Sequence, residues 1–105
     1  MNILFVCSRN KWRSATAETI YQNHPVHQVR SAGTEKSARI KLNAGHIRWA
    51  DLVFVMEKKH KQRIVANFPE VAEDREIIIL NIPDEYRYMN DELIEEIQMK
   101  VNQYL

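Results

Sequence analysis

Four short apolar runs divide the chain, and a polar stretch long enough for a helix separates each from the next. They lie at Asn2–Val6, from Val29 into Gly33, at Leu52–Met56 and at Glu76–Leu80. Runs this short and rich in Ile, Val and Phe are typical of strands buried on both faces, as in parallel sheets. The pattern therefore predicts about four parallel strands.

The intervening segments predict helices. Ser14–Tyr21 is rich in alanine, Glu57–Phe68 carries apolar residues at helical spacing, and a third helix begins after Asn90, a good N-cap. Ser37–Trp49 has no clean period and is either helical or irregular. Strands that alternate with helices predict right-handed βαβ units. We expect a single α/β domain over residues 1–105, a three-layer sandwich with helices on both faces of a small sheet.

Composition narrows the class of protein. The 105 residues are 45% hydrophobic and include one cysteine, so no internal disulfide and no cysteine-based zinc cluster can form. No apolar run approaches the ~20 residues that cross a bilayer, and no basic leader precedes the first run. These features predict a cytoplasmic protein with no membrane partner.

Charge is segregated along the chain. Residues 1–63 carry twelve Lys/Arg and four Asp/Glu (12 − 4 = +8), whereas residues 64–105 carry three and ten (3 − 10 = −7). A basic half suits an anionic ligand. Two solvated faces, or head-to-tail self-association, would explain the same split equally well. The expected state is a monomer or a weak homodimer, and without a stacking or recognition motif no nucleic-acid partner is expected.

The loop between the first strand and the first helix carries the candidate chemistry. It runs from Cys7 to Ser14 and contains Asn10 and Arg13. A strand–loop–helix turn points backbone N–H groups inward and adds the positive end of the helix dipole, which makes an anion cradle. A cysteine at its base is stabilised as the thiolate, the guanidinium of Arg13 matches two phosphate oxygens, and Ser14 can donate to the sulfur.

These residues resemble the low-molecular-weight protein tyrosine phosphatase family. That family opens with an apolar strand and a loop of the form Cys-x-x-Asn-x-x-Arg-Ser. Further similarities are Ala17-Glu18, Ser31–Thr34 and Ala50–Met56. The segment between Thr34 and Ala50 is much shorter than the family usually has. The resemblance implies a metal-independent hydrolase of phosphorylated proteins or small phosphoesters, phosphotyrosine included, without a cofactor.

The resemblance also implies site residues. Cys7 is the expected nucleophile, Arg13 the phosphate clamp and Asp84 the general acid, although Pro83 precedes Asp84 where the family's proline follows its aspartate. Glu85 and Asp91 are rivals for the acid, but Asp91 suits helix capping better. The residues expected to bind the phosphate or the rest of the substrate are Ser8, Arg9, Asn10, Lys11, Trp12, Arg13, Ser14, Tyr86 and Tyr88.

Several positions depart from the family pattern. Arg9 stands where the family usually has glycine and could crowd the cradle or add charge at its mouth. Trp12 replaces a frequent second cysteine, and packing against the neighbouring helix is favoured for it over lining the pocket. Tyr86 and Tyr88 could stack on a phosphotyrosine ring or pack as a lid. The four histidines share no ligand spacing and are expected at the surface or as helix caps.

Other functions use the same loop. A non-catalytic phosphate-binding module is the main alternative, because of Arg9 and the shortened segment. Arsenate reduction requires additional cysteines that the chain lacks. A phosphocarrier role is disfavoured, because Arg13 and Asp84 together favour hydrolysis over storage.

Overall fold

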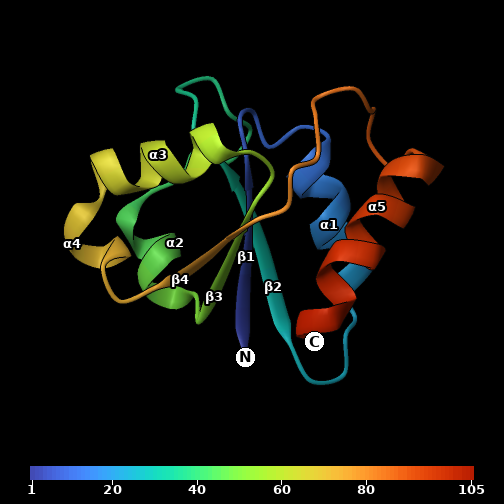
Figure 1. Cartoon of the computed structure of the whole chain (residues 1–105), viewed down its shortest axis with the longest axis horizontal. Coiled ribbons are helices and arrows are strands. Elements are labelled where there is room, and N and C mark those ends of the chain that lie inside the picture. The colour runs from blue at the N-terminus through green and yellow to red at the C-terminus, as the bar shows by residue number, and fades with distance from the viewer.

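Four parallel strands form the centre of the computed structural model, which describes residues 1–105 (Figure 1). The strands are β1 (Asn2–Cys7), β2 (Gln28–Gly33), β3 (Leu52–Val55) and β4 (Glu76–Ile79), in the spatial order β2-β1-β3-β4. All four lie where the apolar runs predict them, and the predicted parallel sheet is confirmed.

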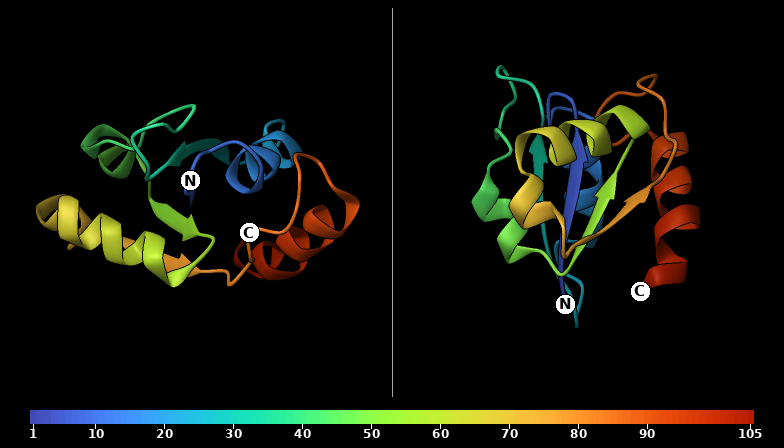
Figure 2. Two further views of the ribbon diagram at one scale, coloured as in Figure 1. Left: turned by 90° about the horizontal axis from the view of Figure 1, so that it is seen from above. Right: turned by 60° about the vertical axis from the view of Figure 1, so that its left-hand side comes forward.

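The sheet is covered on both faces because its central strands are apolar on both faces. Ile3, Phe5 and Cys7 of β1 belong to one buried cluster, and the alternate residues Leu4 and Val6 belong to another. The helices α1 (Arg13–Tyr21) and α5 (Asp91–Val101) pack on the first cluster; α2 (Ala44–Trp49), α3 (Lys58–Asn67) and α4 (Pro69–Ala72) pack on the second. Figure 2 shows the resulting three layers, which confirm the predicted sandwich.

The helix boundaries follow from their caps. The side chain of Asn90 accepts a hydrogen bond from the Leu93 N–H at 3.1 Å, as expected for the N-cap of α5, which a short 3-10 turn (Asn102–Tyr104) continues. The ambiguous segment 37–49 is irregular until Asn43 caps α2. Helix α4, which was not predicted, has only four residues and starts at Pro69, so no period could mark it.

The strand order places the candidate loop at a switch point. Strand β1 pairs with β2 on one side and with β3 on the other, so the chain leaves β1 and β3 in opposite directions. Ligands in such sheets bind at the carboxyl ends of the strands near this point. The loop after β1, the segment after β2, the start of α3 and the segment before α5 all gather at that edge (Figure 1).

None of the helices has the length and apolar character needed to cross a membrane.

Candidate active site

The sulfur of Cys7 lies at the base of the loop and accepts two hydrogen bonds. The backbone N–H of Asn10 donates to it at 3.2 Å, and Ser14 Oγ lies 3.0 Å away. The side-chain amide of Asn10 donates to Ser14 Oγ at 2.7 Å, so the Ser14 hydroxyl proton can point either at the sulfur or at the more distant Ala32 carbonyl, 3.5 Å away. Both donors can point at the sulfur. The buried Cys7 therefore has the surroundings of a nucleophile.

Asn10 gives the loop its shape. Its backbone has a φ of 55°, in the left-handed region that asparagine tolerates better than most residues. This conformation turns its N–H inward to the sulfur, while its carbonyl faces outward and accepts a bond from Arg39 Nε at 3.0 Å. Asn10 is fully buried, so it shapes the cradle from behind and does not line it.

Arg13 is held by hydrogen bonds from one side. Its side chain is 2% exposed, and Nη1 donates both to the Glu57 carboxylate and, at 2.9 Å, to the carbonyl of Ile82. Burial raises the pKa of Glu57, but the hydrogen bond and charge of Arg13 outweigh it and hold that pKa below its ordinary value. Nε and Nη2 make no hydrogen bond within the protein, although Nε forms an ion pair with Asp84 at 3.6 Å, so an oxyanion bound at this edge would take the place of that carboxylate.

Ser8 is oriented by a buried histidine. The backbone N–H of Glu57 donates to His60 Nδ1 at 3.0 Å, so the neutral ring carries its proton on Nε2. Nε2 then donates to Ser8 Oγ at 2.9 Å. Burial, followed by the positive charge of Arg13, lowers the pKa of His60 to about 4, which keeps the ring neutral near pH 7. The acceptor side of the Ser8 hydroxyl is thus occupied, and its proton can be donated into the cradle.

Asp84 faces the loop from the segment before α5. Its Oδ1 lies 3.6 Å from Arg13 Nε, and its side chain is 53% exposed. Together with Cys7 and Arg13 it lines a cavity of about 20 Å³, which has room for roughly one water molecule. A phosphoryl group needs more room.

The remaining predicted residues separate into two groups. Ser8, Arg9, Lys11 and Trp12 line the cavity beside Cys7. Arg9 projects outward with 67% of its side chain exposed and pairs with Glu35 at 3.2 Å, so it does not crowd the cradle. Trp12 also lines a second cavity against α1, and the Lys11 ammonium lies 5.2 Å from the centroid of its ring. Trp12 therefore combines the rim position with the helix packing that the sequence favoured.

Tyr86 and Tyr88 lie outside the small cavity. Tyr86 packs against the apolar cluster under α1 and α5, and the Tyr88 hydroxyl bonds Thr19 Oγ1 at 2.7 Å on α1. Both positions match the lid-packing alternative, and their contact with substrate stays a prediction. Of the rivals to Asp84, Asp91 lies in the first turn of α5 and Glu85 does not line the cavity.

Sequence reasoning missed Glu57 and His60. Both cap α3, as the capping expectation for histidines allowed, but His60 is fully buried and not at the surface. The one available signal was position, because both follow directly after the third apolar run. Parallel strands bring such residues to the same edge as the loop after the first run.

Comparison with known structures identifies the fold. No protein-family model matches the chain, and neither does any curated protein sequence. Three similar solved structures are the tyrosine phosphatase Wzb from Escherichia coli (22% identity, 98% of this chain and 94% of that chain covered, TM-score 0.79), SP-PTP, a low-molecular-weight protein tyrosine phosphatase from Streptococcus pyogenes (15%, 99% and 93%, 0.77), and the YwlE arginine phosphatase from Geobacillus stearothermophilus (23%, 98% and 94%, 0.68). The chain has the fold of the low-molecular-weight protein tyrosine phosphatases. At the level of fold, the resemblance drawn from the loop and the strands is confirmed.

Proposed function

We propose that the chain is a metal-independent phosphomonoester hydrolase that acts through a phosphocysteine intermediate, with protein phosphotyrosine as its expected substrate. The arrangement around Cys7 carries the proposal. Its sulfur accepts hydrogen bonds from Asn10 and Ser14, and the Nε and Nη2 edge of the buried Arg13 makes no hydrogen bond within the protein. The structural likeness to tyrosine and arginine phosphatases supports it.

In the first step the Cys7 thiolate attacks phosphorus. An S–P bond forms and the bond from phosphorus to the leaving oxygen breaks. Arg13 and the loop N–H groups stabilise the charge on the equatorial oxygens, and the Ser8 hydroxyl adds a donor. Asp84, in its protonated form, transfers its proton to the leaving oxygen.

In the second step water hydrolyses the phosphocysteine. The Asp84 carboxylate takes a proton from the attacking water, the new P–O bond forms, and the S–P bond breaks to restore the thiolate. Inorganic phosphate then leaves. The chain has no second cysteine to protect the thiolate as a disulfide, which suits the reducing cytoplasm as the place of action.

The non-catalytic alternative loses one of its two supports. It drew on Arg9 at a position where a side chain could fill the cradle, but that side chain points outward and pairs with Glu35. Its other support was the shortened segment after Thr34. That segment nevertheless contacts the loop, because the backbone N–H groups of Thr34 and Glu35 donate to the carbonyls of Cys7 and Ser8 at 3.0 and 2.9 Å.

The test is hydrolysis of para-nitrophenyl phosphate without metal, from pH 4.5 to 8, by freshly reduced protein. Cys7→Ser should abolish turnover, and Arg13→Ala and Asp84→Asn should each reduce kcat by roughly 10²–10⁴-fold. Phosphotyrosine and phosphoarginine peptides of the same sequence then define the substrate class. Wild-type protein that binds vanadate but turns over none of these substrates would refute hydrolysis and favour the binding module.

A further inference from the structure

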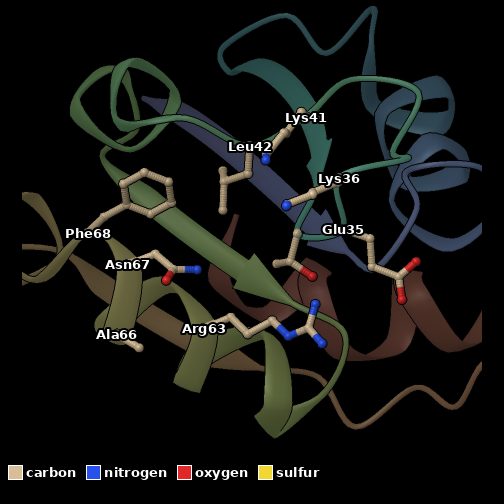
Figure 3. A pocket seen from close by; sticks show the side chains of 9 residues that line it. Glu35, Lys36, Lys41, Leu42, Arg63, Ala66, Asn67 and Phe68 are labelled. Atoms are coloured by element: carbon tan, nitrogen blue, oxygen red, sulfur yellow. The ribbon is translucent and has the colours of Figure 1, made fainter.

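A separate cavity, of about 650 Å³, lies beside the candidate active site, between the segment after β2 and helix α3. It shares no lining residue with the cavities at Cys7 and Trp12. Figure 3 shows it, with Lys36 and Lys41 on one side and Arg63 of α3 opposite them. Its other lining residues are Thr34, Glu35, Leu42, Ala66, Asn67 and Phe68. Leu42 and Phe68 give it an apolar wall, and the polar groups lie around them.

The three cations of this cavity have no partner within the protein. Neither Lys36, Lys41 nor Arg63 forms an ion pair or a side-chain hydrogen bond. The one acidic residue of the lining, Glu35, is already paired with Arg9. Like charges gathered around one hollow repel one another, and an anion placed between them relieves that repulsion.

A polar atom in the wall is also without a partner. Thr34 Oγ1 is buried and makes no hydrogen bond within the protein. The Asn67 amide, on the same wall as Arg63, adds further hydrogen-bonding capacity. The lining therefore provides positive charge, hydrogen-bond donors and a small apolar surface, which together match a carboxylate on a short aliphatic side chain.

The cavity is joined to the phosphate cradle through the backbone. Thr34 and Glu35 donate to the carbonyls of Cys7 and Ser8, and Arg63 lies one helical turn beyond His60, which holds Ser8. An extended peptide advances about 3.3 Å per residue. In the proposal below, residues a few positions from a phosphorylated residue seated at Cys7 are the ones that meet the cavity.

We propose that this cavity binds acidic side chains flanking the phosphorylated residue of a protein substrate. The inference rests on the proposed hydrolase function for the identity of the substrate. It adds a preference that the cradle alone does not supply, since the cradle contacts only the phosphoryl group and its nearest neighbours.

The kinetic test compares two phosphotyrosine peptides, one with glutamates around the phosphotyrosine and one with glutamines at the same positions. Lys41→Gln/Arg63→Gln removes two charges from the cavity, and Lys58→Gln/Lys61→Gln removes two charges from α3 residues that do not line it. We expect the cavity variant to raise KM for the glutamate peptide roughly tenfold. Each exposed ion pair that is lost weakens binding by a few-fold, and the two effects multiply. KM for the glutamine peptide and for para-nitrophenyl phosphate should stay unchanged, and the control variant should change KM less than twofold.

Equal KM values for the two peptides in the wild type would overturn the proposal, as would equal effects of the two double variants. A wild type that hydrolyses no substrate contradicts the hydrolase function and leaves a separate test of the cavity. In that test an unphosphorylated glutamate peptide is titrated into ¹⁵N-labelled protein. Shifts at the amides of Lys36, Lys41 and Asn67 support the cavity. Their absence, or tighter binding of a single-stranded oligonucleotide at the same amides, refutes it.

Discussion

Acidification should destabilise the fold through His60. This ring is fully buried, and its Nδ1 accepts the Glu57 N–H while its Nε2 donates to Ser8. Burial, and then the charge of Arg13, lowers its pKa from 6.5 to about 4. Between pH 6.5 and about 4, His60 is protonated in the unfolded chain but neutral in the folded chain. The free energy of unfolding therefore falls as pH decreases from about 6.5 towards 4, and this effect ends below 4, where both states are protonated.

The size of the effect follows from the two pKa values. With 6.5 in the unfolded state and about 4 in the folded state, lowering the pH from 7 to 5 removes about 2 kcal/mol of stability. Glu57 contributes little to the change in stability between pH 7 and pH 5. Burial raises its pKa but Arg13 lowers it further, so its net shift is downwards from 4.5 and its titration lies below this range.

Urea denaturation at pH 7 and pH 5 measures this difference. His60→Gln should reduce the pH-dependent loss by about 2 kcal/mol, whatever the variant does to stability at pH 7. His46→Gln is the matched control. Burial and then Arg30 lower the pKa of His46 too, but this ring lies in an exposed capping box, so its removal should change the difference less. An unchanged pH dependence in His60→Gln would refute the reasoning, and so would an NMR titration of the His60 ring with a midpoint near 6.5.

Two further predictions concern the frame of the loop. Gly33→Ala should destabilise the protein by about 1–3 kcal/mol in urea denaturation and lower its activity, because a Cβ there would lie 2.6 Å from the Ser8 carbonyl oxygen. A variant as stable as the wild type would contradict this close approach. Asn10→Ala should cost about 2 kcal/mol of stability, because alanine is strained at a φ of 55° and the hydrogen bond to Ser14 is lost. Asn10→Gly loses only the hydrogen bond and should cost less. Equal losses in the two variants would show that the backbone conformation carries no cost.

The sequence was sufficient to predict the sheet and the loop because both are local signals. The apolar runs mark the strands directly, and Cys7, Asn10, Arg13 and Ser14 lie within eight consecutive positions. The side-chain hydrogen bonds that join Cys7, Asn10 and Ser14 to one another lie within that loop. Asp84 could be placed at the same edge because it follows the last strand.

The partners of these residues could not be predicted in the same way. Glu57 and His60 reach the loop only because β3 pairs with β1 in a register that sets Val55 beside Val6. Register is a property of the assembled sheet, and a shift by one residue would turn each side chain to the other face. A capping residue and a buried histidine have no fixed spacing from Cys7 that a sequence pattern could show.

The segment after β2 holds the loop after β1 and also forms one side of the basic cavity. Part of the connection is made by the backbone, since Glu35 and Arg39 donate their N–H groups to the carbonyls of Ser8 and Arg9. Such bonds do not depend on which side chain Arg9 carries, so an arginine is tolerated where glycine is usual. Between this segment and α3, Lys36, Lys41 and Arg63 line the basic cavity.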